Sequence, residues 1–346
     1  MILDGQSPSS IAAAAQALQR GELLGLPTET VYGLAADAGN DAAVAKIFEA
    51  KGRPANHPLI VHVASAQGVQ RFASRVPDFA QKLIDAFWPG PLTLILSRRP
   101  EVAAVAAGGQ NSVGLRCPAH PTAHAVLQSA ETLGVFGVAA PSANLFGRVS
   151  PTTAAHVAHE FGDGLLIIDG GACDVGIEST IVDCTRAAPV LLRPGVLTPQ
   201  QLSDACGVAV ITPSAPDADA PRASGTLDSH YAPTAQVQLM TSAQLQQAID
   251  AYAHANASTH AHATNTALGT VAVWSRSQLH VPTASAQQFQ CKPMPQAATD
   301  CAYQLFAQLR SFDDQGVAHI WVEAPPLTPE WDGVRDRLTR AATPTR

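Results

Sequence analysis

The chain has 346 residues, 46% of them hydrophobic, so it is long enough for two domains of ordinary size with a large core. Only 14% of the residues are charged and the formal net charge is −7, which excludes the broad basic surface of a tight, nonspecific nucleic-acid binder. The six cysteines form no Cys-x-x-Cys pair, and no run approaches the ~18 apolar residues that span a bilayer. These features predict a soluble cytoplasmic protein with reduced thiols.

Helices and strands alternate along the first two hundred residues. An alanine-rich helix is expected over 10–20, followed by a strand at 22–26. The later predicted elements are helices at 42–50, 78–87, 122–133 and 152–161, and strands at 59–64, 92–96, 113–116, 134–139, 165–169, 180–184 and 190–193. This order predicts an α/β domain over 8–211, with a twisted mixed sheet and flanking helices.

The composition changes after Val210. Residues 212–229 are rich in proline, serine, alanine and aspartate without an apolar period, which is typical of a linker. A smaller α/β unit is expected to follow, with strands at 237–240, 270–275 and 317–322, helices at 243–254 and 297–312, and a mobile loop over the tract 255–267. We therefore predict a linker over 212–234 and a Rossmann-like domain over 235–346.

Two common phosphate-binding signatures are absent. No Gly-x-Gly-x-x-Gly follows a strand. Gly171 and Gly176 have the outer spacing of a P-loop, but Ile177-Glu178 stands where Lys-Ser/Thr is required. The sequence thus excludes a P-loop kinase and a plain dinucleotide enzyme. Any nucleotide must be bound by scattered cations and helix ends.

Lys51 and Arg53 are the candidates for phosphate binding. Lysine occurs at only four positions, and Lys51-Gly52-Arg53-Pro54 follows a predicted helix and leads into the strand 59–64. Arginine offers a planar fork for phosphate oxygens, and lysine offers a movable point charge. The two cations would also complement the negative end of the helix, worth under ~1 kcal/mol, so the residues alone leave both roles open.

Polar residues follow several predicted strands, where open α/β sheets bind ligands. The run Thr-Glu-Thr-Val-Tyr at 28–32 lies in the turn after the first strand and fits either a ligand contact or a capped turn. His62 alternates with apolar neighbours, so it faces either a cleft or the core. Arg116 ends a strand, where it fits a substrate carboxylate or a surface ion pair.

A third set of candidates follows the predicted strand 134–139. Ser142 and Asn144 lie in Ala-Pro-Ser-Ala-Asn, where small neighbours leave room for a ligand. Ser150-Pro151 predicts a helix start, with Ser150 as N-cap and Pro151 at the first helical position. A helix N-terminus with free amides binds anions, although capping alone accounts for Ser150.

Taken together, these segments resemble the YrdC/Sua5 family, the threonylcarbamoyl-AMP synthases. The matching motifs are Pro-Thr-Glu-Thr-Val-Tyr-Gly-Leu at 27–34, Lys-Gly-Arg-Pro at 51–54, Pro-Gly-Pro-Leu-Thr at 89–93, Pro-Ser-Ala-Asn at 141–144, Glu-Ser-Thr-Ile at 178–181, Arg-Pro-Gly at 193–195 and His-Tyr-Ala-Pro at 230–233. The last motif is specific to the long, Sua5-type members. The resemblance implies a YrdC-like catalytic domain and a smaller, Rossmann-like Sua5 C-terminal domain.

The resemblance also distributes the candidate residues between two substrates. Lys51 and Arg53 are implied as catalytic residues at the nucleotide phosphates. The implied contacts of L-threonine are Thr30, His62, Arg116, Ala140 and Ser179. The implied nucleotide contacts are Lys51, Arg53, His57, Ser142, Asn144, Ser150, Arg193 and Tyr231. No protein metal site is implied, and Mg²⁺ is expected to arrive with ATP.

The implied activity joins L-threonine, bicarbonate (or CO2) and ATP into threonylcarbamoyl-AMP and pyrophosphate. The product is expected to pass to a tRNA threonylcarbamoyl-transfer complex, and the linker 212–234 is expected to serve as an active-site lid. We expect neither membrane binding nor strong direct binding of nucleic acid. The alternatives are an RNA-binding YrdC-type module and a carbamoyl-transfer module. The lack of Cys-x-x-Cys disfavours the second alternative.

Two positions depart from the family pattern. His57 stands where the family commonly has Asn, so the sequence departs from the family motif at this predicted nucleotide contact. Ser224-Gly225 stands where Pro-Gly is usual. Serine leaves the unfolded backbone freer than proline does, which predicts a somewhat looser start of the lid.

Overall fold

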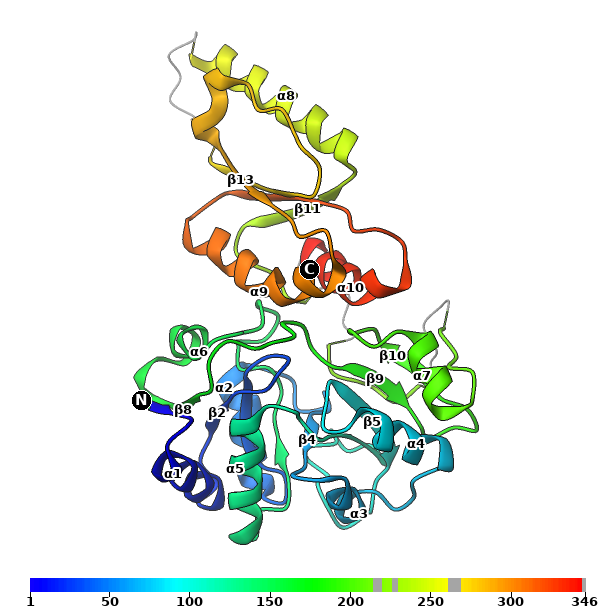
Figure 1. The fold of residues 1–346 in the computed structure, drawn as a ribbon. Helices are drawn as coiled ribbons and strands as arrows, with labels where there is room; N and C mark the ends of the chain where they lie inside the picture. Colours follow the sequence, from blue (N-terminus) through cyan, green and yellow to red (C-terminus); the bar gives the residue numbers. More distant parts are fainter. Residues whose placement is uncertain (214–219, 226–229, 261–268, 344–346) are drawn as a thin grey trace. The chain divides into compact units, whose positions relative to one another are not determined.

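The structure is a computed structural model, which describes residues 1–213, 220–225, 230–260 and 269–343, without the side chains of 256–260. It contains two compact units (Figure 1). The first unit comprises Met1–Phe146 and Ser150–Thr226, and the second comprises Gly147–Val149 and Leu227–Arg346. The predicted domain boundaries stay a prediction. Within the predicted linker, 214–219 and 226–229 lie outside the described residues.

Among the described residues of the first unit, ten strands form one mixed sheet in the order β1-β8-β2-β3-β7-β4-β6-β5-β9-β10. They are β1 (Ile2–Asp4), β2 (Leu24–Leu26), β3 (Gly33–Asp37), β4 (Ile60–His62), β5 (Leu92–Ser97), β6 (Ser112–Arg116), β7 (Val138–Ala139), β8 (Leu166–Asp169), β9 (Thr180–Asp183) and β10 (Val190–Arg193). The predicted α/β fold with a mixed sheet is confirmed. Strands β1 and β3 were not predicted.

Helices cover both faces of this sheet. They are α1 (Pro8–Gln19), α2 (Asp41–Lys51), α3 (Val69–Phe72), α4 (Asp78–Phe87), α5 (Pro121–Thr132), α6 (Ala154–Phe161) and α7 (Pro199–Cys206). The apolar side chains of α1 and α5, which lie side by side in Figure 1, form one core cluster with those of β2. A second cluster joins α2, α4 and α7 to Val61 of β4 and to Leu115 of β6.

Local capping explains where two of these helices begin and end. Asn40 caps α2 by accepting a hydrogen bond from Ala43 N (3.1 Å), and Gly52 ends it in the left-handed conformation (φ 61°), as predicted. The predicted N-cap Ser150 is wrong. Helix α6 begins at Ala154 because Thr153 accepts a hydrogen bond from His156 N (3.2 Å) and so caps the helix three residues later.

In the second unit, the described residues form a parallel sheet in the order β11-β14-β12-β13. Its elements are β11 (Gln236–Met240), α8 (Ser242–His260), β12 (Val271–Ser275), β13 (Phe289–Pro293), α9 (Ala298–Asp314), β14 (His319–Glu323) and α10 (Asp332–Ala342). Strand β13 and helix α10 were not predicted. Helix α8 runs into the tract expected as a loop, since alanine favours helix, and 261–267 lie outside the described residues.

The carboxyl ends of β12 and β14 hold a buried carboxylate. Glu323 accepts hydrogen bonds from Ser275 Oγ (2.7 Å) and from the backbone amides of Arg276 and Ser277 (both 2.8 Å). Burial opposes its ionisation, but these bonds and the Arg276 charge together lower the pKa of Glu323. Ligands of open α/β sheets bind at such strand ends, and here the chain's own carboxylate fills the position.

Residues Gly147–Val149 lie within the second unit although the chain on either side of them belongs to the first. Gly147 O accepts a hydrogen bond from Ala232 N (2.9 Å), and the guanidinium of Arg310 donates to Val149 O. Arg148 lies 4.0 Å from the carboxylate of Asp313. The chain therefore passes from the first unit to the second at more than one place.

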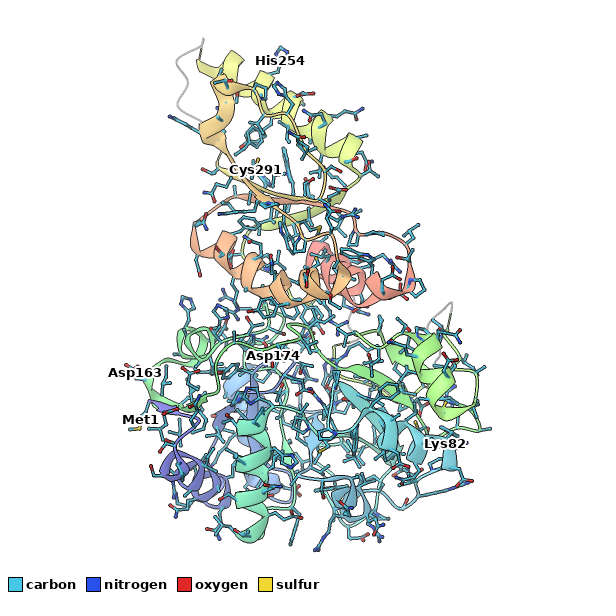
Figure 2. All side chains as sticks on the ribbon, viewed as in Figure 1. Met1, Lys82, Asp163, Asp174, His254 and Cys291 are labelled. Carbon is cyan, nitrogen blue, oxygen red and sulfur yellow. The ribbon has the colours of Figure 1, made fainter. Side chains whose placement is uncertain are left out.

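The described ranges contain no helix whose length and hydropathy suit a membrane span. All six cysteines are free. Five of them are buried, and Cys291, labelled in Figure 2, is exposed. Figure 2 also shows that side chains fill the space between the helices and strands within each unit.

Candidate active site

One face of the first unit's sheet carries polar residues at alternate positions. On β4, Val61 packs into the core cluster of α2 and α4, so His62 points to the opposite face. In the parallel register of β4 and β6, His62 is paired with Arg116. The two polar side chains are therefore neighbours at the carboxyl ends of adjacent strands, the edge at which open α/β sheets bind ligands.

Arg116 is held from three directions. Its Nη1 donates to Thr30 Oγ1 (2.8 Å), its Nε donates to Gly90 O (3.2 Å), and its Nη2 lies 2.7 Å from Glu29 Oε1. Arg116 and Glu29 are 3% and 5% exposed, so this ion pair is removed from solvent. The predicted threonine contacts Thr30, His62 and Arg116 are thus brought together, with Arg116 at their centre.

Glu29 lies in the candidate run 28–32, but it was not assigned to either substrate. Its second carboxylate oxygen accepts a hydrogen bond from Ala119 N (3.1 Å), so both oxygens are engaged. One sequence signal could have identified Glu29. A buried arginine needs a partner, since charged side chains are almost never fully buried alone. A carboxylate between two threonines in the run 28–32 was the candidate partner.

Two other polar residues of this run shape the loop. Thr28 Oγ1 donates to Val31 O (2.6 Å) and lies 2.9 Å from Thr30 Oγ1. The hydroxyl of Tyr32 donates to Gly171 O (2.8 Å), and burial raises the pKa of this phenol. The loop is the tip of the antiparallel β2–β3 hairpin, which fixes Thr30 beside Arg116.

Ser179 directly precedes β9 and contacts Thr93 of β5 and Arg193 of β10. Its hydroxyl is 2.7 Å from Thr93 Oγ1, and Arg193 donates to its carbonyl through Nε (3.1 Å) and Nη2 (2.9 Å). Gly195 allows this approach, because a Cβ there would lie 2.6 Å from Thr180 N. The motifs at 178–181 and 193–195 therefore form one hydrogen-bonded structure.

Lys51 ends α2 with a buried ammonium group. Its Nζ donates to Ser142 O (2.6 Å) and to Asn144 O, so three predicted nucleotide contacts come together. Burial, followed by the charge of Arg53, lowers the pKa of Lys51, while Glu160 and Glu178 oppose that shift. A bound phosphate would favour the charged amine further.

Arg53 gathers the next group of contacts. Its Nη2 donates to Pro58 O (3.1 Å), and its guanidinium lies 5.8 Å from the ring centre of Phe146. The ring of His57 meets the same phenylalanine edge-on at 5.7 Å. Burial and then Arg53 lower the pKa of His57. An acidic chain thus concentrates positive charge here, as a phosphate site requires.

The described linker residues 222–224 lie against this positive region. Ser224 Oγ donates to Pro58 O (2.7 Å) and lies 3.4 Å from Arg53 Nη2, while Ser224 O accepts from Arg193 Nη1 (2.9 Å). Ala223 packs against a cluster of three isoleucines on the sheet. The hydroxyl contacts, which proline lacks, offset the freedom that serine adds at this position.

Three further predicted residues have other surroundings. The buried hydroxyl of Ser150 donates to Glu178 Oε1 (2.5 Å). Ala140 follows β7 and donates its amide to Ile60 O (3.0 Å). Tyr231 belongs to the second unit, where its ring lies 5.3 Å from that of Phe306. Its predicted part in nucleotide binding stays a prediction.

Burial and the neighbouring Arg116 lower the pKa of His62 from 6.5 to about 3, so the folded protein holds a neutral imidazole. In the unfolded chain His62 binds a proton below about pH 6.5, so its contribution to the free energy of unfolding is fully present above that pH. It is expected to fall as the pH drops toward 3, by up to about 1.4 kcal/mol per unit. Urea unfolding at pH 7 and pH 5 measures this slope. His62→Gln should flatten it, and the exposed His254→Gln should not. Equal slopes for all three proteins would contradict the assignment.

The fold and the site together define an α/β protein in which a buried arginine–carboxylate pair with a neighbouring hydroxyl and a second group of buried cations belong to the same unit. A family model described as "Telomere recombination" matches residues 16–195, and one described as "Threonylcarbamoyl-AMP synthase, C-terminal domain" matches 197–343. The chain belongs to the Sua5-type threonylcarbamoyl-AMP synthases.

Relatives from two organisms support this membership. The threonylcarbamoyl-AMP synthase of Bacillus subtilis is 37% identical over 96% of this chain and 92% of its own length. That of Pyrococcus abyssi is 45% identical over 66% of each chain. The solved structure of P. abyssi Sua5 complexed with L-threonine has a TM-score of 0.83 at 35% identity, covering 96% of this chain and 94% of that one. The structure of a P. abyssi Sua5 variant with two alanine substitutions has a TM-score of 0.85 at 34% identity, covering 99% and 96%.

Proposed function

We propose that this chain forms threonylcarbamoyl-AMP and pyrophosphate from L-threonine, bicarbonate or CO2, and ATP, at the site described above. One observation carries the proposal. Arg193 joins Arg53 through Ser224 and also holds Ser179, whose hydroxyl meets Thr93 of β5, the strand that pairs with the Arg116 strand β6. The solved complex of P. abyssi Sua5 with L-threonine supports L-threonine as the amino-acid substrate.

The proposed chemistry matches these side chains. Arg116 binds the carboxylate of L-threonine, and Thr30, His62 and Ser179 surround the rest of it, next to Ala140. The amine forms a carbamate with CO2, and a carbamate oxygen attacks the α-phosphorus of ATP. The bond from this phosphorus to the bridging oxygen breaks and pyrophosphate leaves. The reaction needs no covalent protein nucleophile, so the protein supplies positioning and positive charge.

The nucleotide is assigned to the cationic side of the site. Lys51, Arg53 and Arg193 face the phosphates and stabilise the charge that develops on them. The remaining proposed nucleotide contacts are His57, Ser142, Asn144, Ser150 and Tyr231. In this proposal the linker covers the bound nucleotide as a lid, an arrangement supported by the contacts of Ser224 with both arginines.

Mg²⁺ is proposed to enter as its complex with ATP. Within the described ranges, no three His, Cys, Asp or Glu side chains are grouped to hold a metal ion. Mg²⁺ usually prefers phosphate oxygens, water and one or two carboxylates over a protein cage. The ion would supply charge neutralisation at the phosphates.

The product is proposed to serve tRNA modification in the cytoplasm. Threonylcarbamoyl-AMP is a mixed anhydride, so it is short-lived in water and suits direct passage to a tRNA threonylcarbamoyl-transfer complex. The formal net charge of −7 favours a partner complex, rather than this chain, as the surface that binds tRNA.

The first experiment is to measure pyrophosphate release from ATP and bicarbonate, with L-threonine, with L-serine and without an amino acid. We expect release to depend on L-threonine and to be weaker with serine, which lacks the methyl group. No release with any amino acid would overturn the proposed function.

A further inference from the structure

The Glu29–Arg116 pair carries the two charges that complement those of a free amino acid. At neutral pH, L-threonine carries a carboxylate and an ammonium group. A guanidinium complements the first and a carboxylate complements the second. In this structure the two side chains meet each other at 2.7 Å, within reach of Thr30. Each therefore occupies the place that one charged group of the substrate would take.

Glu29 is anchored so that one of its oxygens can change partner. Oε2 accepts from Ala119 N (3.1 Å), and the backbone carbonyl of Glu29 accepts from Val175 N (2.7 Å). These bonds do not involve Oε1, which faces Arg116. Arg116 in turn keeps its bonds to Thr30 and Gly90 if the pair separates.

We propose that Glu29 binds the ammonium group of L-threonine and accepts its proton when the amine becomes a nucleophile. The proposal rests on the proposed function, because it assigns L-threonine to the group around Arg116. Binding exchanges the internal ion pair for two pairs with the substrate, Arg116 with its carboxylate and Glu29 with its ammonium. The total charge of the site is unchanged by this exchange.

Carbamate formation removes two protons from the substrate nitrogen. The ammonium N–H bond breaks and its proton goes to a Glu29 oxygen, which leaves a lone pair on nitrogen. That lone pair forms a bond to the carbon of CO2, and one C=O electron pair moves to oxygen. The nitrogen then loses a second proton to water, and the product is the carbamate anion. Glu29 ends protonated and returns its proton to solvent after product release.

The neighbouring thiols do not compete for this proton. Burial and then the charge of Glu29 raise the pKa of Cys117 to about 11 and raise that of Cys173 as well. Both thiols therefore stay neutral near pH 7. The charged groups that contact one another here are Glu29 and Arg116.

The test compares L-threonine with 3-hydroxybutanoate, which is threonine without its amine, by calorimetric binding. The wild type is expected to prefer L-threonine by at least ~100-fold, and Glu29→Gln should reduce this preference to less than ~3-fold. At saturating L-threonine, Glu29→Gln should also lower kcat by about 10²–10⁴-fold, because the proton acceptor is lost. Unchanged ATP affinity in the variant shows that the first unit is folded.

Each result has a distinct meaning. A wild-type preference for L-threonine that persists in Glu29→Gln overturns the ammonium contact, and an unchanged kcat overturns proton acceptance. If Glu29→Gln fails to bind ATP, Glu29→Asp decides. The shorter carboxylate should weaken L-threonine binding by ~10-fold or more without changing ATP affinity, and unaltered L-threonine binding contradicts the proposal. If the wild type binds L-threonine but releases no pyrophosphate, the proposed function fails while the binding comparison still tests Glu29.

Discussion

Replacing Lys51 with alanine is expected to lower kcat/KM for ATP by about 10²–10³-fold, the loss typical of removing one preorganised donor. Lys51 is 3% exposed and its Nζ donates to the backbone carbonyls of Ser142 and Asn144, which fix the position of this charge. The affinity for L-threonine should stay unchanged, because the bonds that hold Arg116 run to Thr30, Gly90 and Glu29 and not to this amine. Steady-state pyrophosphate release and calorimetric binding of L-threonine measure the two effects.

Lys46→Ala is the matched control for this experiment. Lys46 lies on the same helix, α2, but is exposed, and its Nζ donates to Gly21 O (2.6 Å). Its removal changes the net charge by the same amount as the loss of Lys51 and should leave turnover within about 2-fold of the wild type. Turnover of Lys51→Ala at the level of this control would show that Lys51 does not bind the phosphates.

Replacing Arg193 with alanine is expected to impair the use of both substrates, whereas Lys51→Ala is expected to impair the use of ATP alone. Arg193 holds Ser179 through its carbonyl and, at 3.2 Å, through its hydroxyl, and it also holds Ser224 of the linker. Loss of a buried, hydrogen-bonded charge costs several kcal/mol, so kcat/KM should fall by about 10²-fold for ATP and for L-threonine alike. Initial rates with each substrate varied in turn separate the two effects.

Arg186→Ala is the control on the same hairpin. Arg186 pairs with Asp183 at 2.9 Å in the turn between β9 and β10, away from Ser179 and Ser224. Its loss should leave both KM values near those of the wild type. If Arg193→Ala raises the KM for ATP alone, Arg193 acts only on the phosphates and does not support Ser179.

The elements that the sequence predicted well are those with a clear apolar period or a cap within a few residues. Asn40 and Gly52 mark the ends of α2 through local hydrogen bonds and a left-handed backbone, which need no distant partner. Strand β3 was missed because Gly33–Asp37 consists mostly of small residues and contains no β-branched ones. It is a strand because β2 and β7 pair with both of its edges.

For the site, too, the sequence predicted some features and not others. A motif at a strand end, such as the one that carries Arg116, locates a candidate residue, but it does not say which groups that residue meets. Thr30 meets Arg116 across 86 positions of the chain, and Ser224 reaches Pro58 across 166. Such pairs are set by the sheet order and the hairpin geometry, so they emerge only when the strands are assembled.

The tripeptide Gly147–Val149 bears on how the chain can be divided. A protein shortened at residue 226 keeps this tripeptide but loses Ala232 and Arg310, the donors to Gly147 O and Val149 O. Those carbonyls would then need water as their partner, in the segment that connects Asn144 to Ser150. A free-standing first unit therefore calls for a redesigned 147–149 turn as well as a new C-terminus.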